Sequence, residues 1–107
     1  MNNNYTPAVE SCRKCVSSSK ACAAAYKVEG GMENCVKACY DCASICELCV
    51  TLGENGSPLF LKSIELCLVA CTNSLTVCET GKNEICTQFT QQCLDCIVEF
   101  NNLIENQ

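Results

Sequence analysis

Apolar residues recur every three or four positions along this chain, in four blocks separated by short polar and glycine-containing segments. Side chains three or four residues apart share one face of a helix, whereas a strand would divide them between two faces. The pattern therefore predicts four helices of similar length, over residues 7–28, 32–52, 58–80 and 82–104. Short connections between such helices favour antiparallel neighbours, so we expect an all-α, up-down-up-down four-helix bundle forming one domain over residues 1–107.

Turn and capping signals separate these helices. Thr6 followed by Pro7 is typical of an N-cap and a first helical residue, and Ser57-Pro58 repeats the pair before the third helix. Gly30-Gly31 is expected to end the first helix, residues 53–56 to form a turn after the second, and Gly81 to end the third.

Cysteine is the unusual component of the apolar pattern, with 14 in 107 residues. The clearest example is residues 35–49, CVKACYDCASICELC, in which successive thiols are 4, 3, 4 and 3 residues apart. One heptad register per helix puts every cysteine of the chain at an a or d core position. The predicted core thiols are Cys12, Cys15, Cys22, Cys35, Cys39, Cys42, Cys46, Cys49, Cys67, Cys71, Cys78, Cys86, Cys93 and Cys96.

The two ends of this predicted bundle differ in composition. The end where the first helix begins collects large apolar core residues near Cys49: Tyr5, Ala8, Phe60, Ile64, Phe100 and Leu103. The opposite end collects thiols and a thioether among two aromatic residues: Cys22, Tyr26, Met32, Cys35, Cys78, Cys86 and Phe89. We therefore expect a sulfur-lined core that is plugged at the first end and has its candidate opening at the second.

Charge and composition exclude several classes of function. A net charge of −5 disfavours binding to nucleic acid, and the absence of histidine removes imidazole metal sites and Ser–His or Cys–His catalysis. The most apolar segment, residues 58–71, is interrupted by Lys62 and Glu65, so no membrane role is expected. The first residues lack a basic region followed by an apolar run, which favours a cytoplasmic location, where structural disulfides are rare.

Three uses of so much sulfur can be weighed. Packing alone gives no reason to prefer a reactive thiol over Ala or Val, and facing helices 8–10 Å apart are too distant for a full set of disulfides. Thiolate-only metal sites suit Cu(I), Zn(II) or iron–sulfur clusters. One Cu(I) replacing one thiol proton adds no buried charge, and bridging sulfurs could let the core hold on the order of a dozen ions.

The pattern of CxxC and CxxxC pairs resembles that of the bacterial copper storage proteins, and most closely their cytosolic branch. Cys12–Cys15, Cys35–Cys39, Cys42–Cys46, Cys46–Cys49, Cys67–Cys71 and Cys93–Cys96 are such pairs. The resemblance covers nearly the whole chain and implies non-catalytic storage of many Cu(I) ions, entry at one end of the bundle, and homo-oligomers, namely tetramers. Family members often carry histidine near the opening; this chain has none, and Met32 is the candidate entry ligand.

Two other functions remain open at this stage. A thiol redox protein could use one CxxC pair, for example Cys93–Cys96, but it would need an exposed thiol of low pKa at a helix start. A zinc or metallothionein-like sink would use the same thiols. On the outside, Leu59, Leu66 and Val69 form an apolar stripe that could support self-association, and Glu47, Glu65 and Glu79 are expected to be solvated rather than metal ligands.

Overall fold

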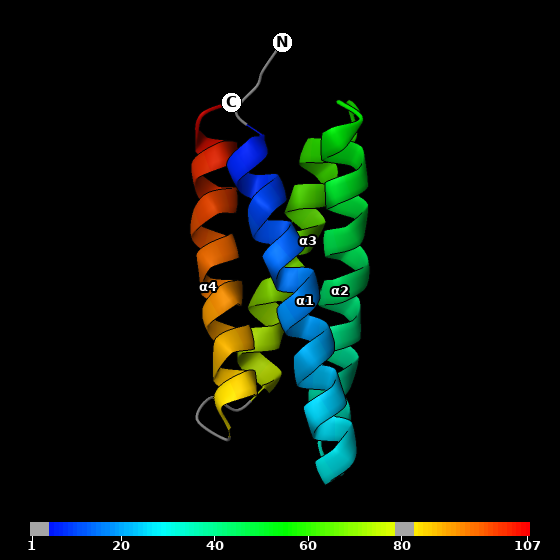
Figure 1. The fold of residues 1–107 in the computed structure, drawn as a ribbon. Coiled ribbons are helices and arrows are strands. Elements are labelled where there is room, and N and C mark those ends of the chain that lie inside the picture. The colour runs from blue at the N-terminus through cyan, green and yellow to red at the C-terminus, as the bar shows by residue number, and fades with distance from the viewer. Residues whose placement is uncertain (1–4, 79–82) are drawn as a thin grey trace.

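The computed structural model, which describes residues 5–78 and 83–107, contains four consecutive helices packed in antiparallel fashion (Figure 1). They are α1 (Thr6–Glu29), α2 (Glu33–Glu54), α3 (Phe60–Val77) and α4 (Glu84–Glu105). Helix α1 lies against α2 and α4, and α3 packs against the same two helices to complete the bundle. The predicted all-α bundle is confirmed, and its core runs along the long axis of a molecule 46 Å in length.

The helix boundaries differ from the predicted ones by a few residues. Thr6 already belongs to α1 and Tyr5 is its N-cap, so the predicted capping role of Thr6 is wrong. The turn predicted at residues 53–56 begins late, because α2 continues through Glu54. The predicted start of the third helix at Ser57-Pro58 is also wrong, because Leu59 is the N-cap of α3. The Ser57 hydroxyl instead accepts a hydrogen bond from the Leu59 amide at 3.0 Å in the short turn before the helix.

The end of α3 is the boundary that matters most for the core. Helix α3 ends at Val77, and Cys78 has extended backbone angles, with φ −96° and ψ 133°. The helix was predicted to continue to residue 80; the role predicted for Gly81 lies outside the described residues. At the next helix, the Asn83 side chain accepts a hydrogen bond from the Cys86 amide at 2.8 Å and so caps α4.

The end of the bundle where α1 begins is closed by hydrocarbon, as predicted. Phe60, Ile64 and Phe100 are fully buried there, and the Tyr5 ring lies with its centroid 4.4 Å from that of Phe60. Gly53 makes this packing possible, because a Cβ at that position would lie 2.6 Å from a Val9 methyl group and 2.9 Å from the Phe60 ring. We call this region the closed end.

Polar pairs at seven-residue steps fix the register between α1 and α2. The pairs are Arg13–Glu54, Lys20–Glu47 and Lys27–Tyr40. The Lys20 ammonium lies 3.0 Å from the Glu47 carboxylate, and Lys27 donates to the Tyr40 hydroxyl at 2.8 Å. Each exposed ion pair contributes little free energy by itself, but their common spacing selects one alignment of the two helices.

Three large apolar side chains are exposed at the start of α3 and along its outer face. Leu59, Leu66 and Val69 are 61%, 49% and 65% exposed, as the sequence predicted. Helix α3 is the one helix in the described part of the chain with the length and apolar composition to cross a membrane, a test that the core helix of a bundle also passes. Its Cys67 and Cys71 side chains are buried in the bundle, which is the arrangement of a core helix.

Candidate metal centre

All fourteen cysteines lie in the core, and none is more than 4% exposed. Each helix contributes them from its inward face, because spacings of three, four and seven residues return a side chain to the same side of a helix. Twelve are free thiols, and the remaining two form a disulfide. The prediction of a cysteine-lined core is therefore confirmed, and the sulfurs gather into groups along the bundle axis.

The central group takes one cysteine from each helix: Cys15, Cys42, Cys71 and Cys93. Their four sulfur atoms all lie within 4.8 Å of one another, at a spacing that one metal ion or a small cluster could bridge. Hydrogen bonds from Cys15 and Cys42 lower the pKa of Cys71 below the ordinary thiol value. Hydrogen bonding with Cys15 raises the pKa of Cys42 and of Cys93, which favours the protonated thiol at these two positions.

A second group lies between the central group and the closed end. Cys12, Cys46 and Cys67 have their sulfurs within 4.8 Å of one another, and those of Cys46 and Cys67 are 3.3 Å apart. Cys49 adjoins this group, since its hydrogen-bonding interaction with Cys12 raises the pKa of Cys49 to about 12. The thiols of this second group come from three helices, α1, α2 and α3.

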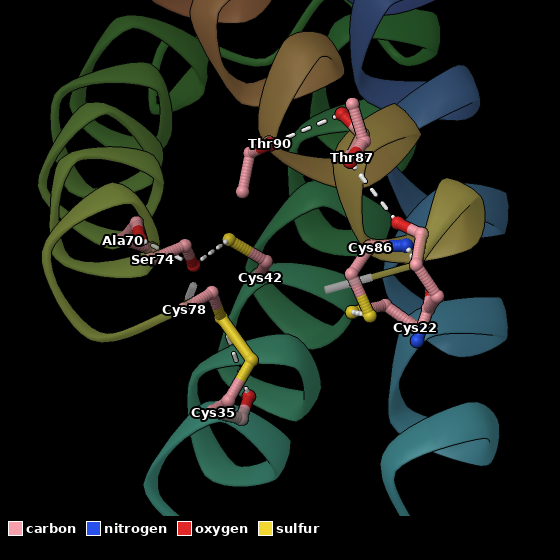
Figure 2. The surroundings of a disulfide bond; sticks show 10 residues. Cys22, Cys35, Cys42, Ala70, Ser74, Cys78, Cys86, Thr87 and Thr90 are labelled. Atoms are coloured by element: carbon pink, nitrogen blue, oxygen red, sulfur yellow. Dashed lines mark hydrogen bonds between the residues drawn. A yellow bond between two sulfur atoms is a disulfide. The ribbon is translucent and has the colours of Figure 1, made fainter. Parts of the chain in front are cut away.

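A third group lies at the opposite end, which we call the sulfur end. Its members Cys22, Cys35 and Cys39 have sulfurs within 4.8 Å of one another. Cys86 of α4 adds a further sulfur, 3.2 Å from that of Cys22, and burial raises the pKa of Cys86 to about 11 (Figure 2). Although the sequence indicated an opening here, the four cysteines are at most 1% exposed.

One disulfide joins Cys35 near the start of α2 to Cys78 just after α3 (Figure 2). Their Cα atoms are 4.9 Å apart, within the range that a disulfide can bridge. This proximity depends on Cys78 leaving the helix in extended conformation, whereas helical residues are held at the spacing of the helix axes. The expectation that a full disulfide set would not form agrees with twelve free thiols, but these two predicted ligands are cross-linked here.

Cys96 belongs to none of these groups among the described residues. Its thiol donates to the Ser11 carbonyl at 3.4 Å, and the Gln92 amide lies 3.7 Å from its sulfur. The side chain is fully buried at the seam between α1 and α4. Its predicted role as a ligand is not tested by this geometry and stays a prediction.

Met32, Glu47 and Glu65 lie outside the three sulfur groups. Met32 is half-buried at the sulfur end and lines a cavity of about 240 Å³ with Glu33, Asn34 and Cys35. Glu47 pairs with a lysine, in line with a solvated carboxylate. Glu65 does the same with Lys62, and Glu79 lies outside the described residues.

Buried hydroxyl groups are a part of the core that the sequence reasoning did not single out. Ser19 donates to the Cys15 carbonyl at 2.5 Å, and the Ser74 hydroxyl lies 3.1 Å from the Cys42 sulfur (Figure 2). Both serines are fully buried. The signal was available, because the heptad register that predicted the thiols also places Ser19 and Ser74 at core positions.

Comparison with known proteins gives one family. A family model described as "Csp: Copper storage protein" matches residues 1–105 of the 107. No curated protein and no solved structure matches significantly. The match covers nearly the whole chain and includes every cysteine of the three sulfur groups.

Proposed function

Because the chain belongs to the copper storage protein family, we propose that it holds its copper as Cu(I), bound by the core thiols as cargo rather than as a catalytic cofactor. The family is one of storage proteins and not of enzymes. The observation that carries the proposal is the gathering of buried sulfurs from different helices into groups with spacings below 4.8 Å. Such groups can share several ions without a rearrangement of the helices.

The chemistry of the donor set favours the monovalent ion. Sulfur is the only donor type within each group, and thiolates are the ligands that select Cu(I). The groups lie in a core where an uncompensated charge is costly. One Cu(I) that replaces one thiol proton leaves the net charge unchanged, so the core can fill with many ions.

Of the three sulfur groups, the central one is the group that could also hold Zn(II). Four thiolates around one Zn(II) form an ordinary structural site, and Cys15, Cys42, Cys71 and Cys93 could supply them. Such a site carries a net charge of −2, and repeating it along the core would accumulate buried charge. A zinc sink of high capacity is therefore disfavoured by the depth of the other groups.

The redox alternative gains no support from the Cys93–Cys96 pair. Both thiols are fully buried, and Cys93 lies in the middle of α4 rather than at a helix start. The neighbouring Cys15 raises the pKa of Cys93, and it raises the pKa of Cys96 as well. A nucleophilic thiol needs the opposite conditions.

We further propose a cytoplasmic location and a homo-oligomer, a tetramer by resemblance to the family. Twelve free thiols are compatible with a reducing compartment. The exposed Leu59, Leu66 and Val69 on α3 offer an apolar face for contact between copies. Size measurement of the purified chain in solution tests the second part, and a monomer at micromolar concentration would rule it out.

The central test is an anaerobic titration of fully reduced protein with Cu(I) against a competing chelator. We expect uptake on the order of a dozen ions per chain, whereas Zn(II) in a parallel titration should fill about one site. The matched variant C42S/C71S removes two central sulfurs, and we expect it to take up about two Cu(I) fewer. Uptake of only one or two Cu(I) by the reduced wild type would contradict storage.

A further inference from the structure

A layer without thiols interrupts the sulfur core between the central group and the sulfur end. On three of the four helices, the core position between successive cysteines holds another residue. These positions are Ser19 on α1, Ser74 on α3 and Phe89 on α4. All three side chains are fully buried, so the layer lies within the core rather than at its surface.

The layer divides the thiols into two sets. The inner set has nine members, Cys12, Cys15, Cys42, Cys46, Cys49, Cys67, Cys71, Cys93 and Cys96. The outer set has five, Cys22, Cys35, Cys39, Cys78 and Cys86. Only α2 carries cysteines without interruption across the layer, through Cys39 and Cys42. The Ser74 hydroxyl lies 3.1 Å from the Cys42 sulfur, on the side where a bridging thiol from α3 would otherwise be.

The disulfide removes ligands from the outer set alone. With Cys35 and Cys78 linked, the free outer thiols are Cys22, Cys39 and Cys86. Reduction would restore two thiols, one of them in the group whose sulfurs lie within 4.8 Å of one another. All nine inner thiols are free, and none of them takes part in this bond.

The disulfide is buried, since Cys35 and Cys78 are 1% and 4% exposed, but small molecules can approach Cys35. A cavity of about 240 Å³ reaches it, lined by Gly31, Met32, Glu33, Asn34, Cys35 and Val77. Cys35 is the cysteine of the bond that lines this cavity, and Val77, which also lines it, directly precedes Cys78 in the chain. The inner thiols are fully buried behind the core layer.

We propose that the outer set is a separate copper site whose ligand number is set by reversible oxidation of Cys35 and Cys78. The oxidant is a low-molecular-weight disulfide of the glutathione class. The two protein S–H bonds and the S–S bond of the small disulfide break; the protein S–S bond forms, and both protons leave on two small thiols. The inner set keeps its capacity in both states. This inference deepens the proposed storage function and rests on it.

The experiment compares copper capacity in the two redox states. Reduced wild-type protein is treated anaerobically with oxidised glutathione, the linked cysteines are identified by peptide mass spectrometry, and Cu(I) uptake is measured by chelator competition. We expect a Cys35–Cys78 link, a loss of two free thiols, and uptake of about two Cu(I) fewer than in the reduced protein.

Two variants separate the outer from the inner set. C35S/C78S should bind about two Cu(I) fewer than the reduced wild type, and its capacity should not change on oxidation. C12S/C67S, the inner control, should also start about two ions lower but keep the oxidation-dependent loss. An oxidation-dependent loss that persists in C35S/C78S would overturn the proposal.

The remaining outcomes are also decisive. Failure of oxidised glutathione to form the Cys35–Cys78 link, or formation of the link without loss of capacity, would overturn the redox control while leaving storage intact. Failure of the reduced wild type to bind several Cu(I) ions would instead contradict the storage function itself. Thiol counting under denaturing conditions reports the link independently of copper.

Discussion

The two ends of the bundle use the same helical positions for different purposes. At the closed end, core positions hold Phe60, Ile64 and Phe100, which are fully buried. At the sulfur end, equivalent positions hold Cys22 and Cys86, with sulfurs 3.2 Å apart. The residues named here are all helical, so the difference between them lies in side-chain chemistry. The comparison shows how one register can build an aromatic and aliphatic plug at one end and a group of buried thiols at the other.

The largest effect is expected from removing the plug. Phe60→Ala deletes a fully buried ring at the closed end and should lower the free energy of unfolding by about 3–5 kcal/mol. Chemical denaturation of the reduced, metal-free protein measures this change. The neighbouring Leu59 is 61% exposed, and Leu59→Ala should stay within about 0.5 kcal/mol of the wild type. Equal losses in both variants would contradict the assignment of the plug.

A smaller loss is expected at the glycine that the plug requires. Gly53→Ala would bring a Cβ within 2.6 Å of the Val9 methyl group and 2.9 Å of the Phe60 ring. Overpacking of this kind costs about 1–3 kcal/mol, which outweighs the gain of about 1 kcal/mol that alanine brings to a helix. Thermal unfolding should show a lower Tm for this variant, while the exposed control Ser44→Ala on α2 should not lower it. Unchanged or higher stability of Gly53→Ala would mean that the closed end repacks freely.

A further expected effect, on copper affinity rather than on folding, is a pH dependence that both ends should share. Burial raises the pKa of Cys86 to about 11, and Cys12 raises that of Cys49 to about 12, so both thiols are protonated at neutral pH. Because Cu(I) binds the thiolate, each such thiol must lose its proton. Apparent affinity should therefore rise about tenfold per pH unit for each proton released, and level off only above these pKa values.

Chelator competition at several pH values between about 6 and 8, with proton release followed in weak buffer, measures this linkage. C49S and C86S provide matched variants for the two ends, and each should release about one proton fewer at saturation. An affinity that does not change with pH would show that the thiols are already ionised before copper arrives.

The sequence predicted the fold and the inward direction of the thiols because both follow from periodicity. Spacings such as 35–39–42–46–49 leave only one face on which a helix can present these side chains. The sequence could not predict which sulfur atoms lie close together. That depends on how far each helix is shifted along the bundle axis relative to its neighbours, and packing between the helices sets this shift. The pairing of Cys15 with Cys42, Cys71 and Cys93 is a property of the assembled bundle.

The disulfide shows a second limit of sequence reasoning. Its formation depends on α3 ending at Val77, which releases Cys78 from helical geometry. The sequence signal for the helix end was Gly81, three residues beyond Cys78, and it favoured a longer helix. A difference of one helical turn in a boundary thus decided whether two thiols could meet. Helix ends are where local preferences are weakest and tertiary contacts decide.

The first residues of α1 and the last residues of α4 both lie at the closed end (Figure 1). The sulfur end is at the other extremity of a bundle 46 Å long. A fluorescent fusion, an affinity handle or a surface tether attached beside the start of α1 or the end of α4 would therefore stand clear of the end at which the sequence predicts that copper enters. This geometry suits the protein to immobilised copper capture, in which the anchoring point and the working face must not compete for space.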